Sequence, residues 1–341
     1  MGGNEFDFRE VSDEQTKDFR EVTYNNPIST EADPIEVFKG KKGLVLCGGG
    51  AKGVFQCGVL RILKEKGLLD NIGAISGVSI GAINSVLYMM DDLDGMDKVW
   101  DDMDPENIIS IDNLEIGDNG LYFSRSKVTK ILTDYLDFDK IRNSDIKLYA
   151  GVSKILGSDT YVAEYLTLNG KSDTEIKDII TASSSLPVIY EPVKINGALY
   201  MDGGPTDNEP VKPLYDAGIR DFIVIGMTYG KKFDETKYPG AHFEVIYPSL
   251  DLGGLLSGTL NFYDSNKEFV RKLGRKDAER YIKIHIEMDE SYIAMEQTLK
   301  EIDQRSVIND ARATNAYNTF HSRISSSMDY IKNLDEKYKD Y

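Results

Sequence analysis

The chain has 341 residues, of which 41% are hydrophobic, and it carries a formal net charge of -17. This length is enough for one large α/β domain with appendages, or for two domains. The acidic charge disfavours nucleic-acid binding and strong adsorption to anionic membranes, because both need a basic surface.

The first 41 residues are polar and acidic, and Pro27 and Pro34 interrupt them. They contain no basic region followed by an apolar run, which a secretory signal would require. Met1-Gly2-Gly3 could suggest myristoylation, but Phe6 stands where that motif needs serine or threonine. We therefore predict a polar N-terminal arm over residues 1–41 and a cytoplasmic protein.

The cysteines and histidines give no sign of a metal or cofactor site. Cys47 and Cys57 are the two cysteines, and we interpret them as small buried residues in a reducing compartment. His242, His285 and His321 are scattered, and neither CxxC nor HExxH occurs. We predict no metal and no cofactor.

Two strand-turn-helix units follow one another from Lys42 onward. In the first, the apolar run Leu44–Cys47 leads into Gly48-Gly49-Gly50-Ala51-Lys52-Gly53, and apolar residues then recur at helical spacing. Such glycines let several N–H groups point into one small space, which attracts negative charge. They also fit a dinucleotide fingerprint, but that fingerprint expects an acidic residue at the end of the next strand, whereas Asp70 precedes the strand.

The second unit places a serine on a sharp turn. Residues 72–75 predict a strand, residues 82–90 predict a mostly apolar helix, and Gly77-Val78-Ser79-Ile80-Gly81 joins them. Gly77 and Gly81 flank Ser79 where a side chain would block the approach of strand and helix in a nucleophile elbow. A membrane helix over residues 71–90 is an alternative, but its three glycines and missing basic anchors disfavour it. Two ordinary glycine turns in an α/β core are the other alternative.

Residues 91–104 are strongly acidic and predict a helix that contains Trp100 and ends before Pro105. Their aspartates lack the alternating ligand pattern and the glycine of a calcium-binding loop, so we interpret them as a solvated face. Farther on, residues 146–152 and 160–165 predict two strands, and Ser172 followed by Glu175 predicts a capped helix start.

A second candidate catalytic group follows the predicted strand Leu199–Met201. There Asp202 stands on the turn Gly203-Gly204-Pro205, although an aspartate that only caps the turn is the alternative. Phe222–Gly226 predicts a further buried strand. The alternation of strands and helices indicates a mainly parallel sheet with helices on both faces.

Residues 251–341 predict a mostly helical extension packed on the preceding domain. Its one clear basic cluster is explained either as a solvated helix face or as a contact for lipid head groups. The cluster consists of Arg271, Lys272, Arg275 and Lys276.

Four motifs together resemble the patatin-like phospholipase family. They are GGGAKG, GVSIG, ASSSLP, and DGG followed by Asp207-Asn208-Glu209-Pro210, in the family's order over roughly Gly43 to Met227. The resemblance implies a three-layer α/β/α domain over residues 42–250, and hydrolysis of fatty acyl esters by a serine-aspartate dyad. It makes Ser79 the nucleophile and Asp202 its base. It places the oxyanion hole at Gly48, Gly49, Gly50, Lys52 and Gly53.

The chemistry follows from the residues as well. Acyl transfer needs a nucleophile, a proton acceptor, and donors facing the oxygen that becomes negative. An aspartate is a weak base at its ordinary pKa of about 4, so Asp202 would have to be buried beside Ser79. Two alternatives remain: a Ser-His-Asp triad with His242 or His285, and a non-catalytic module that binds nucleotide or lipid. We predict an acyl-ester substrate with at most peripheral membrane contact.

Overall fold

The computed structural model describes residues 38, 40–108, 114–117, 120–157, 160–187 and 189–305. The predicted N-terminal arm lies outside these residues except for Phe38, Gly40 and Lys41. The chain divides into two compact units, of which one runs to Glu279 and the other starts at Arg280. The predicted boundary after residue 250 stays a prediction.

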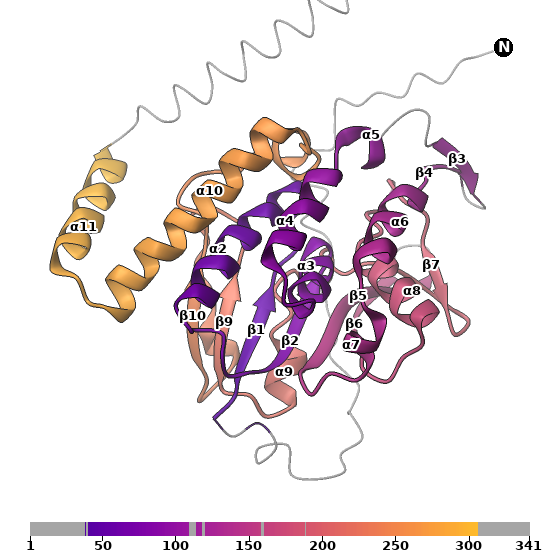
Figure 1. Cartoon of the computed structure of the whole chain (residues 1–341), viewed down its shortest axis with the longest axis horizontal. Coiled ribbons are helices and arrows are strands. Elements are labelled where there is room, and N and C mark those ends of the chain that lie inside the picture. Colours follow the sequence, from indigo (N-terminus) through magenta and orange to yellow (C-terminus); the bar gives the residue numbers. More distant parts are fainter. Residues whose placement is uncertain are drawn as a thin grey trace, which may run out of the picture. The chain divides into compact units, whose positions relative to one another are not determined.

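Eight described strands form one sheet, in the order β10-β9-β1-β2-β5-β8-β7 with β6 paired to β5 (Figure 1). Two further strands, β3 and β4, form a separate hairpin. The strands are β1 (Lys42–Leu46), β2 (Ile72–Val78), β3 (Leu114–Gly117), β4 (Gly120–Phe123), β5 (Lys147–Gly157), β6 (Thr160–Thr167), β7 (Val193–Ile195), β8 (Ala198–Asp202), β9 (Asp221–Ile225) and β10 (His242–Ile246).

The sheet is mixed. The pairs β10–β9, β9–β1, β1–β2 and β2–β5 are parallel, whereas β5–β6, β5–β8 and β7–β8 are antiparallel. The predicted α/β fold with flanking helices is therefore confirmed, and its parallel part runs from β10 to β5. The antiparallel side is the one that carries Asp202, at the end of β8.

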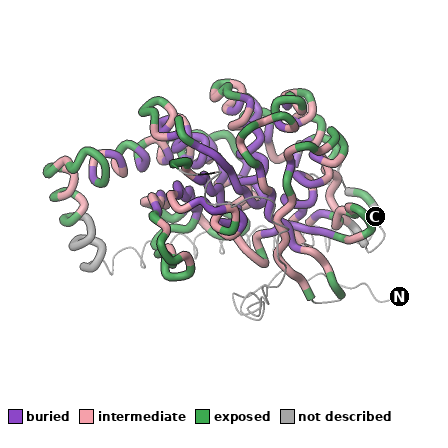
Figure 2. Tube along the Cα trace, turned by 90° about the horizontal axis from the view of Figure 1, so that it is seen from below, coloured by how far each residue is buried: buried purple, intermediate pink, exposed green. Residues whose placement is uncertain are grey.

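Buried residues lie mainly at the centre of the described trace and exposed residues mainly toward its edges (Figure 2). The α-helices are α2 (Val54–Glu65), α3 (Ile80–Met89), α4 (Leu93–Asp102), α5 (Pro105–Ile108), α6 (Ser126–Tyr135), α7 (Phe138–Arg142), α8 (Asp173–Ser183), α9 (Lys212–Asp216), α10 (Asp264–Tyr281) and α11 (Glu290–Arg305). Shorter 3-10 turns are η1 (Gly50–Gly53) and η3 (Glu235–Lys237), and π-helical turns are η4 (Leu255–Thr259) and η5 (Ile282–Ile286). The acidic helix is confirmed as α4, and the capping box of Ser172 and Glu175 begins α8.

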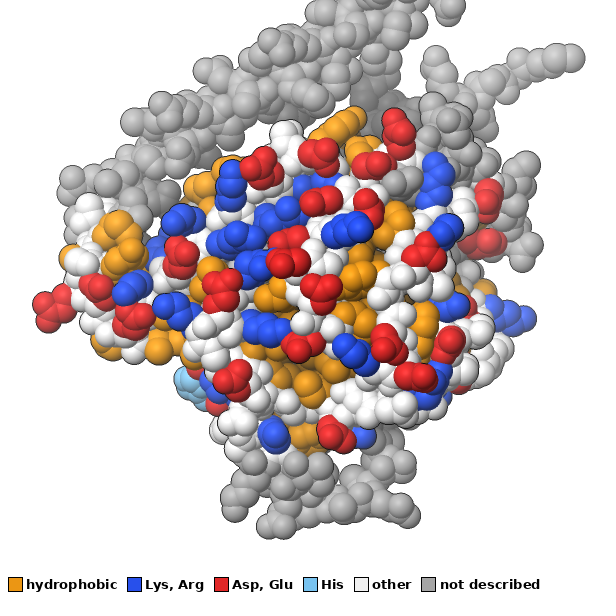
Figure 3. All heavy atoms as spheres, viewed as in Figure 1, with side chains coloured by type: hydrophobic (Ala, Val, Ile, Leu, Met, Phe, Trp, Pro, Cys, Tyr) orange, Lys and Arg blue, Asp and Glu red, His pale blue; other side chains and the backbone are white. Residues whose placement is uncertain are grey.

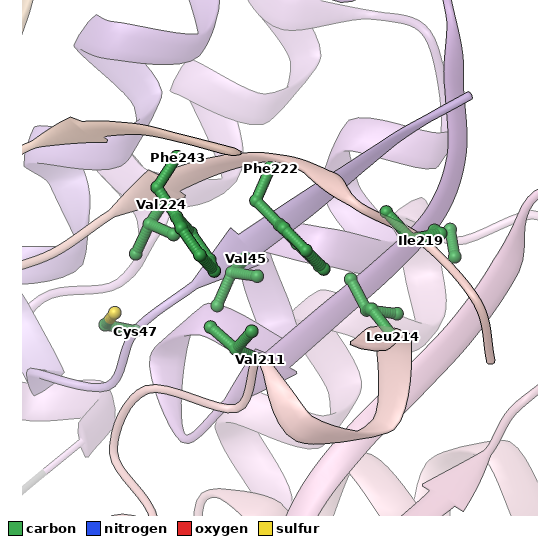
Figure 4. Packing of buried hydrophobic residues seen from close by; sticks show 9 residues of the cluster. Val45, Cys47, Val211, Leu214, Ile219, Phe222, Val224 and Phe243 are labelled. Atoms are coloured by element: carbon green, nitrogen blue, oxygen red, sulfur yellow. The ribbon is translucent and has the colours of Figure 1, made fainter. Parts of the chain in front are cut away.

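Strand β1 is buried on both faces. Its side chains point alternately to the two faces, and those on either face are buried. Val45 and Cys47 belong to a hydrophobic cluster that includes residues of β9, β10 and α9, whereas Leu44 and Leu46 are fully buried outside that cluster (Figure 4). Within the cluster the rings of Phe222 and Phe243 stack with their centroids 4.9 Å apart. Burial on both faces explains the continuous apolar run in the sequence.

Helix α10 packs tightly on α2 where two glycines meet. A Cβ atom on Gly58 would overlap the main chain of α10, and one on Gly274 would overlap the main chain of α2. In the basic cluster, Arg271 pairs with Asp97 and Asp101, and Arg275 pairs with Asp97. Lys272 and Lys276 pair with acidic residues of α10 itself. Positive and negative side chains thus alternate over this face, as Figure 3 shows, which favours the solvated-face interpretation.

The second unit contains η5 and α11 among its described residues, so the predicted helical character of the C-terminal region is confirmed there. The rings of Tyr281 and His285 lie 4.5 Å apart within it. Within the described parts of the chain, no helix has the length and apolar character needed to cross a membrane.

Candidate active site

Ser79 lies on a strained turn between β2 and α3, as the sequence predicts. Its φ of 56° and ψ of -127° are rarely adopted by residues other than glycine. Its N–H donates to Ser183 Oγ at 3.1 Å, and that hydroxyl donates to Gly151 O at 2.7 Å. The turn is thus held from two neighbouring elements and directs the serine out of the sheet.

The glycines on either side of Ser79 are required by close packing. A Cβ atom on Gly77 would overlap the main chain of Gly81, and one on Gly81 would overlap the carbonyl of Leu46. The steric argument made from the sequence is therefore supported at both positions.

The glycine-rich turn lies directly against Ser79. A Cβ atom on Gly48 would come within 3.0 Å of Ser79 Cβ. Among the described main-chain hydrogen bonds, the N–H of Lys52 donates to Gly49 O at 3.2 Å, but none engages the N–H groups of Gly48, Gly49 or Gly50. Gly48 and Gly50 thus lie near Ser79 with N–H groups that no described main-chain bond outside helices and strands uses, whereas Lys52 uses its own.

Lys52 and Gly53 have other surroundings in the structure. The Lys52 side chain is partly buried, and burial lowers the pKa of its ammonium group. Gly53 is buried against Ile80 and Trp100, where a side chain would clash. Its carbonyl accepts from Asn84 Nδ2 at 2.9 Å, which ties the glycine turn to α3.

Asp202 lies near Ser79 but comes from β8, on the other side of β5 from β2. Val78, which precedes Ser79, pairs with Gly151, and Asp202 pairs with the next residue, Val152. Ser79 and Asp202 therefore flank one position of β5. After Asp202 the chain crosses β5, since a Cβ atom on Gly203 would overlap Gly151 and Val78.

The Asp202 carboxyl group is buried and has a raised pKa. Burial raises this pKa from 3.8 to about 6, and hydrogen bonds from Ser79 and the Gly204 N–H and the charge of Arg125 oppose the rise. Oδ1 accepts from the Gly204 N–H at 2.8 Å, but Oδ2 has no hydrogen bond of normal geometry in the described structure. The carboxyl thus lies close enough to Ser79 to interact with it and keeps one oxygen available.

Arg125 is a site residue that the sequence did not reveal. Its guanidinium donates to the carbonyl and the hydroxyl of Ser184 and stacks on Tyr190, with 4.5 Å from Cζ to the ring centroid. The next residue, Ser185, accepts the N–H of Asp202 at 2.9 Å. Arg125 thereby holds the turn that holds Asp202. Ser183 to Ser185 belong to the ASSSLP motif, which could have pointed to this turn but not to the arginine.

Ser79 opens onto a narrow, mainly apolar pocket with a cavity of about 50 Å³. On the scale of about 10–15 Å³ for each water molecule, this space holds only a few waters. Helices α3 and α6, the turn after α8 and the segment after β10 supply its walls. The lining residues are Gly50, Ser79, Ile80, Ile83, Met103, Ile108, Arg125, Val128, Ser184, Leu186, Tyr190, Thr259, Leu260 and Phe262.

His242 does not belong to this site, so the alternative of a Ser-His-Asp triad that uses His242 is wrong. It begins β10 and faces Asp221 at the start of β9, with 3.1 Å between Nδ1 and Oδ1. Ser79 follows the opposite, carboxyl end of a parallel strand. His285 lies in the second compact unit, and His321 lies outside the described residues.

His242, Asp221 and Glu244 do form one group of possible metal ligands, which the scattered histidines of the sequence did not predict. The ammonium group of Lys42 lies 3.1 Å from Glu244 Oε1 and 3.9 Å from Asp221 Oδ2. A cation of the protein itself therefore already neutralises this group. Asp70 likewise lies before β2, away from the glycine turn, where a dinucleotide site would not use it.

The model of the patatin-like phospholipase family matches residues 44–215 of the chain. The chain is also similar to lysophospholipase NTE1 of Cryptococcus neoformans, with 27% identity over 197 residues that cover 54% of this chain and 11% of that protein. It is 29% identical over 202 residues to the probable lipid hydrolase 463L of Invertebrate iridescent virus 6, covering 55% of this chain and 67% of the viral protein. The match thus spans about a tenth of the fungal relative.

Two solved structures also match the chain. VipD from Legionella pneumophila is 16% identical with a TM-score of 0.42, and the match covers 72% of this chain and 67% of VipD. Human GIVD cytosolic phospholipase A2 is 9% identical with a TM-score of 0.40, and the match covers 78% of this chain and 62% of that protein.

Proposed function

Because the chain belongs to the patatin-like phospholipase family, we propose that it hydrolyses fatty acyl esters of lipids with Ser79 as nucleophile and Asp202 as general base. One observation carries the proposal. A strained serine and a buried aspartate with a pKa of about 6 flank one position of β5, and the glycine-rich turn lies against the serine. Burial makes the carboxylate basic enough to accept a proton near neutral pH.

The reaction would proceed in two steps. Ser79 Oγ attacks the ester carbonyl, its proton passes to Asp202 Oδ2, and the N–H groups of Gly49 and Gly50 hold the oxyanion. The protonated carboxyl then donates to the leaving alcohol, and in the second step Asp202 activates water to release the fatty acid. Gly204 fixes Oδ1 through its N–H, so Oδ2 is the oxygen that exchanges the proton.

The proposed substrate is a glycerolipid, and a lysophospholipid is the first to test because the fungal relative carries that name. The apolar pocket walls suit an acyl chain better than a polar head group. A cytoplasmic setting is part of the proposal, and it is supported by two buried, free cysteines, Cys47 and Cys57.

Labelling with a fluorophosphonate, followed by peptide mapping, tests the proposal directly. We expect the adduct on Ser79, together with release of fatty acid from lysophosphatidylcholine by the unlabelled protein. The variant His285→Ala is expected to react at the wild-type rate, because the dyad uses no histidine. An adduct elsewhere, no adduct, or loss of labelling in folded His285→Ala would contradict the dyad.

Arg125→Met is expected to shift the pH dependence of kcat/KM. Hydrolysis needs the Asp202 carboxylate, so activity should fall as the pH drops through about 6. Removing the positive charge of Arg125 takes away a stabilising influence on the carboxylate, so the acidic limb of the pH profile should move to higher pH.

The control for this prediction is Arg142→Met, which removes an arginine that pairs with Asp139 and Asp173 away from the pocket. In this control the acidic limb of the pH profile of kcat/KM should stay at the wild-type position. An unchanged limb in Arg125→Met would show that the arginine does not act on Asp202, even if the overall rate falls.

A further inference from the structure

The segment that connects β10 to α10 has an inner face directed at the proposed active site. Thr259, Leu260 and Phe262 form one wall of the pocket. A Cβ atom on Gly50 would overlap the carbonyl of Thr259, so η4 lies directly on the glycine-rich turn. We call residues 253–263 the apolar cover.

The covered pocket is too small for the proposed substrate. Its cavity of about 50 Å³ compares with roughly 300–1,000 Å³ in sites that hold drug-sized ligands, and a fatty acyl ester of a lipid is at least as large. An acyl chain therefore needs space that the cover occupies, and the cover must move before the ester can reach Ser79.

The outer face of the same segment is unusually apolar. Leu255 is 53% exposed, Leu256 is 74% exposed and Tyr263 is 66% exposed. Leu250 and Phe269, on either side of the cover, are also exposed. These five are nearly half of the large hydrophobic side chains exposed in the described residues, yet they fall within 20 positions of the chain. Such a concentration marks an interaction surface.

The cover is anchored at its far end and begins with two glycines at its near end. The buried Lys267 ammonium donates to the carbonyls of Trp100, Asp101 and Met103, at 2.9, 3.1 and 3.1 Å, which fixes the start of α10 on α4. At the near end, Gly253 has a φ of +85° and Gly254 follows it. The segment between these points can change its path while α10 stays in place.

The chemistry of the site identifies what the outer face contacts. The lipid whose ester enters the pocket must approach past the cover, so the apolar outer face and the pocket wall meet the same lipid phase. Asp264, next to the cover, has a 90% exposed side chain, and the chain as a whole carries a charge of -17. Attraction to an anionic surface is thereby disfavoured, and apolar insertion into a neutral or zwitterionic surface is favoured.

We propose that the apolar cover docks on a zwitterionic lipid surface through Leu255, Leu256 and Tyr263, and that this contact draws Thr259 off Gly50 and opens the pocket. Figure 1 shows that β1 and β2 point toward the end of the molecule at which α10 begins, which is where the cover lies. The proposal deepens the proposed function and rests on it for the nature of the substrate.

The test uses the double variant Leu255→Ser/Leu256→Ser, neither of whose positions lines the pocket. A matched control is Leu156→Ser/Leu199→Ser, which removes two leucines that are 58% and 40% exposed on β5 and β8. Binding to phosphatidylcholine vesicles is measured by flotation in the full chain carrying Ser79→Ala, so that hydrolysis does not alter the vesicles. We expect Leu255→Ser/Leu256→Ser, the cover pair, to weaken vesicle binding by at least about tenfold relative to the Ser79→Ala chain. The control pair, Leu156→Ser/Leu199→Ser, should bind as tightly as the Ser79→Ala chain.

Turnover by the same double variants, now with the native Ser79 in place, gives the second readout. The ratio of vesicle hydrolysis to hydrolysis of a soluble short-chain ester should fall about tenfold in the cover pair and stay constant in the control pair. Equal vesicle binding by both pairs, or tighter binding to phosphatidylserine than to phosphatidylcholine vesicles, would overturn the docking proposal. If no ester is hydrolysed but binding still depends on the cover, the proposed function fails while the docking surface stands.

Discussion

Ser79→Ala is expected to abolish hydrolysis, with kcat/KM falling by at least about 10³-fold. In the proposed reaction the Ser79 hydroxyl oxygen forms the acyl-enzyme, and no other described serine lies on a strained turn that opens onto the pocket. Alanine keeps the main chain of the turn, because Ser79 holds its place through its N–H bond to Ser183 and not through its side chain.

The measurement is turnover of a short-chain nitrophenyl ester together with fluorophosphonate labelling. Ser85→Ala is the matched control, since Ser85 is a buried serine of α3 whose hydroxyl donates to Ala82 O. It should keep full labelling. Substantial turnover in a folded Ser79→Ala protein would refute the assignment of the nucleophile.

Asp202→Asn is expected to lower kcat by about 10²- to 10⁴-fold while making the fold more stable. The amide cannot accept the Ser79 proton. The stability gain arises because burial raises the pKa of Asp202 from 3.8 to about 6, so at neutral pH the folded protein holds an unfavourably buried charge. A rise of this size corresponds to a cost of roughly 3 kcal/mol in the stability of the folded protein at neutral pH. The neutral amide does not carry this cost.

The sign of the pH dependence follows from proton binding. Between about pH 4 and pH 6 the folded state binds the Asp202 proton more tightly than the unfolded state, so this group's contribution to stability falls as the pH rises. The Tm of Asp202→Asn should therefore exceed that of the wild type at pH 7.5, and the difference should vanish near pH 4. Asp277→Asn, which alters a buried aspartate bound by the Ser249 N–H, should keep its activity. A lower Tm for Asp202→Asn at pH 7.5 would contradict the burial cost.

The sequence predicted those parts of the site that depend on local sterics. Gly77 and Gly81 could be predicted because a nucleophile elbow leaves no room for their side chains, and the structure has the same close contacts. Asp202 could be predicted because an apolar strand ends at a glycine turn. The parallel half of the sheet followed from the alternation of strands and helices.

The remaining parts depend on contacts between distant residues. Arg125 lies 59 positions from Ser184, and in the sequence it reads only as part of a polar helix start. The apolar cover lies more than 200 positions from Gly50, and its glycines and leucines show no clear periodicity. The antiparallel direction of β8 could not be predicted from the sequence either. The direction of a strand depends on how the connecting chain runs and not on the composition of the strand.

The buried polar network behind the glycine turn contains the chain's single tryptophan. Trp100 Nε1 donates to Asn84 Oδ1 at 2.9 Å, and its ring stacks on Phe262, which belongs to the apolar cover, with 6.3 Å between centroids. Intrinsic emission from this one indole should therefore change when Phe262 moves away. The protein thus carries its own optical reporter, which allows opening at a lipid surface to be timed by stopped-flow without any attached dye.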